Sequence, residues 1–193
     1  MRKVRIDNDI SMYPMPVVLV GAMVEGRPNF LTVAWVSRVN YDPPMVAIAL
    51  GSEHYTNPGI EKSGAFSVNV PSVELVEKVD FCGLVSGRDY DKSAIFELFY
   101  GEETGAPMVA ACPLSMECRL VRKVDLGGDV LYIGQIVGAY ADAKCLTRGR
   151  PDVRKMRPFA LTMPDNIYWS LGDPVAEAWE AGKKLKYLDK EEG

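Results

Sequence analysis

The chain has 193 residues, of which 48% are apolar and 25% are charged, so it can bury a core of its own as one domain over residues 1–193. Its net charge of −4 and scattered basic residues exclude nonspecific nucleic-acid binding, which needs clustered Lys and Arg. No run of about 20 apolar residues is present, which excludes a membrane-spanning helix. The start, Met1 to Arg5, leads into acidic residues instead of the apolar segment of a secretory signal, so we expect a cytoplasmic protein with no membrane partner.

The first third of the chain predicts antiparallel strands. Val17–Met23 is an apolar run, a turn follows at Glu25 to Asn29, and Phe30–Ser37 should return as the second strand of a hairpin. Asp42-Pro43-Pro44 then forces an extended break, because the residue before a proline avoids the helical region. Strands are expected next at Met45–Leu50 and Ala65–Val70, separated by a polar loop at Ser52–Pro58 and a short helix beginning near Asn57.

The remaining two thirds predict two helices and a long hairpin. Ser72 is a candidate N-cap for a short helix that ends near Gly83. Thr104–Pro113 is a loop rich in Gly and Pro, and Met116–Val124 and Val130–Ala141 should pair as long strands. Asp173-Pro174 predicts the start of a last helix, with Asp as cap and Pro at the first helical position.

Cysteine and histidine spacing does not predict a metal site. The four cysteines are widely separated, no C-x-x-C pair occurs, and the chain has one histidine, His54. We therefore expect packed thiols and no metal. His54 is interpreted as a hydrogen-bonding surface residue. Many evenly spaced strands with few helices favour a mainly β barrel over a doubly wound sheet, and no G-x-G-x-x-G follows a strand.

Several motifs occur in an order that is familiar. They are YPMP at 13–16, NFLTVAW at 29–35, DPP at 42–44, HYTNPGI at 54–60, SGAFSVNV at 63–70 and, more loosely, SGRDYDK at 86–92. Together they resemble the flavin reductase-like branch of the FMN-binding split-barrel flavoproteins, and the Thr-x-Ala-Trp at 32–35 is most similar to the flavoredoxin subgroup. The resemblance implies a six-stranded antiparallel split barrel with Greek-key connections. It also implies a homodimer with FMN at or near the subunit interface.

The resemblance implies two parts of a flavin site. An isoalloxazine ring needs a flat apolar wall and backbone N–H groups near its N5 edge, and the residues that the resemblance assigns to this wall are Asn29, Thr32, Val33, Ala34, Trp35, Ser37, Leu50 and Gly51. The phosphate needs donors and a compensating charge. Ser52, Thr56 and Lys92 are implied for it, with Tyr55 as a further candidate, although Lys92 could instead be a solvated lysine. Tyr168 could cover the flavin, with simple packing as the alternative.

Two departures bear on the electron donor. Many dedicated flavin reductases have His after Gly-Asp in the later hairpin and Glu after the following Gly, where this chain has Val130 and Gln135. We therefore predict an FMN-binding oxidoreductase of flavoredoxin or flavin reductase type that transfers electrons through bound FMN, and no side chain is expected to act as the catalyst. Its partner could be a redox protein or a flavin-dependent oxygenase.

The alternatives are an NAD(P)H-dependent flavin or ferric reductase and a non-catalytic flavin-binding module, and FAD is possible in place of FMN. A further alternative is a relative of pyridoxamine phosphate oxidase, although the Arg-rich phosphate signature expected there is missing.

Overall fold

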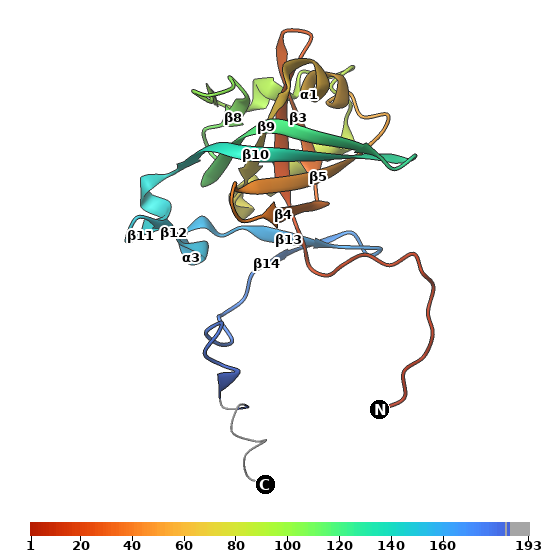
Figure 1. Ribbon diagram of the computed structural model, residues 1–193, viewed down its shortest axis with the longest axis vertical. Coiled ribbons are helices and arrows are strands. Elements are labelled where there is room, and N and C mark those ends of the chain that lie inside the picture. The colour runs from red at the N-terminus through yellow and green to blue at the C-terminus, as the bar shows by residue number, and fades with distance from the viewer. Residues whose placement is uncertain (184, 186–193) are drawn as a thin grey trace.

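The computed structural model describes residues 1–183 and 185, and it is dominated by antiparallel strands (Figure 1). Seven strands form the main sheet in the order β3-β2-β6-β9-β10-β5-β4. In chain order these are β2 (Val18–Val24), β3 (Arg27–Val33), β4 (Val36–Asn40), β5 (Met45–Gly51), β6 (Ala65–Val70), β9 (Leu114–Asp125) and β10 (Asp129–Ala141). The mainly β, antiparallel fold class is thus confirmed.

The sheet curls into a barrel that is split at its two end strands, β3 and β4. The predicted strand Phe30–Ser37 is in fact two strands, because Val33 pairs with Val18 on β2 whereas Val36 pairs with Ile48 on β5. Ala34 and Trp35 cross between them, which gives the sheet seven strands instead of six. The β2–β3 hairpin turns at Glu25 and Gly26, both at positive φ, as a two-residue turn of this kind requires.

Short elements cover the barrel. The helices are α1 (Asn57–Ser63), α2 (Val76–Leu84) and α3 (Val153–Met156), with single 3₁₀ turns at Val73–Leu75, Lys92–Ile95 and Ala143–Cys145. The short strands are β1 (Met15–Pro16), β7 (Leu98–Tyr100), β8 (Pro107–Val109), β11 (Leu146–Thr147), β12 (Arg150–Pro151), β13 (Phe159–Thr162) and β14 (Ile167–Ser170). The predicted helix after Ser72 is confirmed, whereas β8 lies in the segment predicted as a loop.

Two apolar cores hold these parts together. One fills the barrel with side chains of six of its strands, including Val20, Phe66 and Tyr132. The second joins the outer side of β2 and β3 to α2, β8 and β13, and it includes Phe30, Val79 and Phe159. All four cysteines are free and buried, so the prediction of packed thiols is confirmed, and burial raises the pKa of the Cys82 thiol to about 11.

The predicted C-terminal helix is wrong in the described part of the chain. Residues 171–177 have no regular structure, and turns follow at 178–182. Val175 is 100% exposed and Trp179 is 93% exposed, so the apolar face that the pattern indicated has no surface of this chain to pack against. A helix this short is marginal without such packing.

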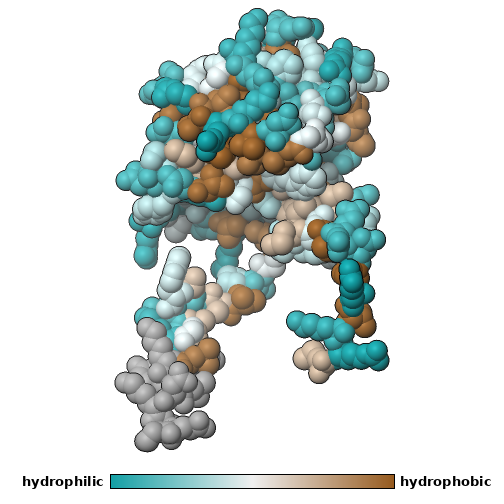
Figure 2. Space-filling model, turned by 45° about the vertical axis from the view of Figure 1, so that its right-hand side comes forward, coloured by the Kyte–Doolittle hydropathy of each residue, from teal (hydrophilic) through white to brown (hydrophobic). Residues whose placement is uncertain are grey.

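Both ends of the chain leave the body on the same side. Figure 2 shows the two terminal arms standing clear of the barrel, and Figure 1 places them beyond β13 and β14. The N-terminal arm, residues 1–12, also exposes apolar side chains, among them Val4, Ile6 and Met12. No helix among the described residues is both long and apolar enough to cross a membrane.

Candidate functional site

The split of the barrel contains a cavity of about 330 Å³, which we call the ring pocket. Its walls come from the β3–β4 crossing, the end of β5 and two later loops, and its lining residues are Thr32, Val33, Ala34, Trp35, Ala49, Leu50, Gly51, His54, Asp129 and Met163. Six of the residues implied for the flavin ring therefore lie around one cavity. Trp35 gives it a broad apolar surface and is 52% exposed.

Backbone pairing and one side-chain bond fix this wall. Ala49 N–H donates to Trp35 O at 2.9 Å, which holds the crossing segment against β5. The Thr32 hydroxyl donates to Val79 O of α2, so the ring pocket is tied to the second core. Val33 and Leu50 also belong to the barrel core. Ser37 lies apart from this wall, exposed on β4, where it lines a neighbouring groove.

A second cavity of about 270 Å³ adjoins the first, and we call it the tail pocket. It lies between the β5–α1 loop and the segment that follows α2. The lining residues are Leu31, Glu53, His54, Tyr55, Thr56, Gly83, Leu84, Val85, Ser86, Gly87, Arg88 and Lys92. His54 lines both cavities, so the two pockets meet at its side chain.

Lys92 places a buried positive charge at the tail pocket. The residue is 2% exposed, and its ammonium donates to Cys82 O at 2.9 Å and to Val85 O at 3.1 Å. No carboxylate within residues 1–183 or 185 forms an ion pair with it. Burial lowers the pKa of Lys92. The alternative of a solvated lysine is therefore wrong, and the charge that remains here favours an anionic ligand.

The other residues implied for the phosphate are placed differently from one another. Thr56 is buried, and its hydroxyl accepts from Asn29 Nδ2 at 2.9 Å. Asn29 thus supports the tail pocket from β3 and does not line the ring pocket. Ser52 is exposed, and its backbone N–H donates to Gly128 O at 3.0 Å. It lines neither pocket.

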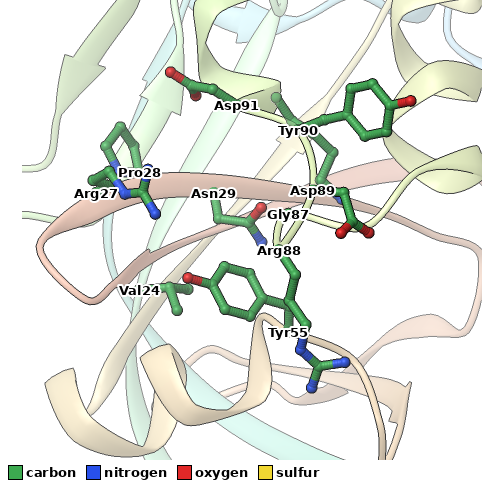
Figure 3. A pocket seen from close by; sticks show the side chains of 11 residues that line it. Val24, Arg27, Pro28, Asn29, Tyr55, Gly87, Arg88, Asp89, Tyr90 and Asp91 are labelled. Carbon is green, nitrogen blue, oxygen red and sulfur yellow. The ribbon is translucent and has the colours of Figure 1, made fainter.

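Tyr55 separates the tail pocket from a smaller cavity of about 90 Å³, the outer pocket. Figure 3 shows the outer pocket, with the Tyr55 ring lying across it beside Arg88. The tyrosine hydroxyl donates to Glu25 Oε2 at 3.1 Å. The hydroxyl is therefore hydrogen-bonded at the β2–β3 turn, and the aromatic ring is the part of Tyr55 that faces the tail pocket.

Tyr168 lies away from both pockets. Its hydroxyl donates to Asp80 Oδ1 of α2 at 2.8 Å, and its ring meets that of Phe159 edge to face at 5.4 Å. Burial, followed by the Asp80 hydrogen bond, raises its pKa to about 12. These contacts fit the packing alternative, with Tyr168 tying β14 to α2.

Several residues that the sequence does not assign to the site line its pockets, among them His54, Arg88, Asp129 and Met163. His54 was expected to be a plain surface residue, yet its exposed ring lines both pockets. Burial and then Lys92 lower its pKa, while Asp129 acts in the opposite direction. Arg88, Asp129 and Met163 also line the pockets. Arg88 and Asp129 stood inside matched motifs, but nothing in the sequence distinguishes Met163.

The two pockets suit a flavin mononucleotide in their chemistry. The ring pocket offers a broad apolar face, and the tail pocket offers the buried Lys92 ammonium, with which no carboxylate of the described residues forms an ion pair. Both cavities have a size near the lower end of ligand pockets, about 300 Å³. An apolar planar group joined to an anionic tail fits this pair of cavities.

Known proteins are similar to this chain over most of its length. The model of the family described as flavin reductase like domain matches residues 10–151. The crystal structure of flavoredoxin from Methanosarcina acetivorans is 46% identical, with a TM-score of 0.94, and the match covers 96% of this chain and 100% of that one. Flavoredoxin of Desulfovibrio vulgaris (Miyazaki F) is 32% identical, with a TM-score of 0.87 and coverage of 95% and 100%.

A reductase is also among the relatives. The ferric-chelate reductase (NAD(P)H) of Archaeoglobus fulgidus is 33% identical over 120 residues, which are 58% of this chain and 68% of that protein. The match to the family model, the high structural similarity and these identities agree with one another. The chain therefore belongs to the flavin reductase-like family, in its flavoredoxin subgroup, and is a flavin-dependent oxidoreductase.

Proposed function

We propose that the chain binds one FMN, with its ring system in the ring pocket and its phosphate in the tail pocket, and transfers electrons through it. The observation that carries this proposal is the buried Lys92 ammonium, which has two carbonyl partners and no ion-pair partner within the described residues. Lys92 lines the tail pocket, and the tail pocket meets the apolar ring pocket at His54. A charge-assisted bond from Lys92 to a phosphate would satisfy the ammonium and fix the tail of the ligand.

The protein's part is to bind and orient the flavin. When bound, FMN supplies the redox chemistry, which takes place at N5 of its ring. Trp35 and Ala34 offer the ring a flat apolar surface, and the backbone of the β3–β4 crossing provides the polar groups at its edge. Lys92 and Thr56 hold the tail, which sets the position of the ring.

Equilibrium dialysis with FMN and riboflavin tests the proposal. FMN should bind more tightly, because riboflavin lacks the phosphate that Lys92 can neutralise. Equal affinity for the two ligands would reject the tail-pocket assignment. Failure to bind either one would reject the flavin site altogether.

We further propose that a redox protein, and not NAD(P)H, is the preferred electron donor. Val130 stands where many flavin reductases have His, and its side chain is buried in the barrel core, so it contributes no polar group to the ring pocket. Gln135 pairs with Met45 on β5.

Stopped-flow mixing with NADH, NADPH and dithionite tests this preference for a protein donor. Slow bleaching by both nicotinamides with fast bleaching by dithionite is expected, whereas bleaching by either at about 1–10³ s⁻¹, a rate typical of enzymes, would identify a flavin reductase proper.

A homodimer is proposed as the working form. A larger groove, about 670 Å³, continues from the ring pocket along β4 and shares Ala34, Trp35 and Ala49 with it. It is lined mainly by apolar residues and by the N-terminal segment, so a second copy could cover it and one face of the ring pocket. A redox protein or a flavin-dependent oxygenase would then meet the dimer.

A further inference from the structure

A wall of shared residues separates the tail pocket from the outer pocket beside Lys92. The two cavities share Tyr55, Gly87, Arg88 and Lys92, so they lie on the two sides of these residues. Lys92 is the residue proposed for the phosphate of FMN. Any group attached beyond that phosphate must pass the Tyr55 ring into the outer pocket or turn away into solvent.

Several independent contacts hold the Tyr55 ring in place. Its hydroxyl donates to Glu25 Oε2 at 3.1 Å, and the Arg88 guanidinium carbon lies 5.8 Å from the ring centroid. Gly87 packs so closely that a Cβ added to it would lie 2.8 Å from Tyr55 Cδ1 and 2.1 Å from Asn29 Oδ1. Figure 3 shows the ring between Val24 and the Gly87–Arg88 backbone. The Tyr55 side chain is therefore held in place at its hydroxyl, on one face of its ring and along one edge of the ring.

The space behind this wall is small and of mixed charge. The outer pocket measures about 90 Å³, which is far below the ~300 Å³ at the lower end of ligand pockets. Arg27, Arg88 and Lys92 line it, but so do Asp89 and Asp91. A second phosphate there would meet two carboxylates beside the three cations, and an adenosine would not fit.

We propose that Tyr55 is a specificity residue that ends the flavin site at the first phosphate and thereby selects FMN over FAD. The inference rests on the proposed flavin site. Tyr55 acts by occupying the path of the tail, with Glu25 and Arg88 as the residues that position its ring. FAD must then leave its second phosphate and adenosine in solvent, where the protein gives them no compensating contact.

Isothermal titration with FMN, FAD and riboflavin, on wild type and three variants, tests this selection. The wild type should bind FMN at least about tenfold more tightly than FAD, which corresponds to about 1.4 kcal/mol. Tyr55→Ala opens the wall and should reduce this ratio by about threefold or more. Tyr55→Phe keeps the ring and loses only the bond to Glu25, so it should retain most of the ratio. Tyr55→Leu, whose side chain is shorter than the tyrosine ring and so still opens part of the wall, replaces Tyr55→Ala if the latter fails to fold.

The outcomes separate this inference from the proposed function. Equal binding of FMN and FAD by the wild type would overturn the selection while leaving the flavin site intact. The same would follow if Tyr55→Ala or Tyr55→Leu weakened both ligands equally. Loss of FMN binding in the wild type would instead overturn the proposed function, and the inference with it.

Discussion

Lys92 is the residue on which the phosphate assignment depends most directly. Lys92→Met should weaken FMN binding by about 1–3 kcal/mol, the range for hydrogen bonds to charged groups, because the phosphate loses its cation. Riboflavin affinity should stay the same. Lys78→Met is the matched control, since Lys78 also donates to a carbonyl, Ile95 O at 2.8 Å, but on the surface and away from the pockets. Equal loss of both ligands in Lys92→Met would indicate damage to the fold instead.

His54 should give the flavin-free protein a pH dependence of its own. Burial and Lys92 lower its folded-state pKa below the ordinary 6.5, so the folded state takes up its proton less readily than the unfolded chain. The stability that the neutral imidazole contributes is present above 6.5 and is lost as the pH falls below it. The free energy of unfolding measured with urea should therefore fall more steeply from pH 7.5 to about pH 5.5 in the wild type than in His54→Gln. Parallel profiles would contradict this, since the chain has no other histidine.

At the scale of elements, Tyr168 tests whether β14 supports the fold or the ligand. Tyr168→Phe removes the hydroxyl that donates to Asp80 of α2, so chemical denaturation should report a loss of about 0.5–1.5 kcal/mol in the free energy of unfolding. FMN affinity should be unchanged, because the ring pairs with Phe159 and lines neither pocket. A clear drop in FMN affinity without a loss of stability would return Tyr168 to the flavin site.

Strand pairs with a clear apolar pattern were predictable from the sequence. Val17–Met23 and Ala65–Val70 were predicted within a residue of β2 and β6, because their residues fill a core on both sides. The break at Ala34–Trp35 was not predictable, since the apolar pattern continues through it and only long-range pairing separates β3 from β4. The helix after Asp173 was also mispredicted, because a cap and a first-turn proline indicate a start but cannot supply a packing partner.

At the scale of the whole molecule, the terminal arms test the dimer. Deletion of residues 1–12 removes an exposed apolar segment, part of which lines the large groove. Light scattering at micromolar concentration should report twice 21.3 kDa for the full chain and a weaker or absent dimer after deletion. A full-length monomer that retains FMN would contradict the shared site.

A single domain over residues 1–193 also stays a prediction, and one cooperative unfolding transition would support it.

The candidate site could be predicted from the sequence only in part. Motif order predicts Thr32, Trp35 and Lys92 for the site, and the structure places these residues at the two pockets. The same order could not indicate that Asn29 supports Thr56 from behind or that the Tyr55 hydroxyl is engaged by Glu25. Those outcomes depend on which side chains meet across strands that are distant in sequence.

The split between β3 and β4 also bears on whether the protein folds before it binds flavin. The barrel core is filled by the chain's own side chains, and the ring pocket lies at the edge of this core, at the open seam. Folding therefore does not have to wait for the flavin, and a newly made chain can be completed first and loaded afterwards. The same seam would let a spent or damaged flavin be replaced without dismantling the barrel, so the polypeptide can outlast any one molecule of its cofactor.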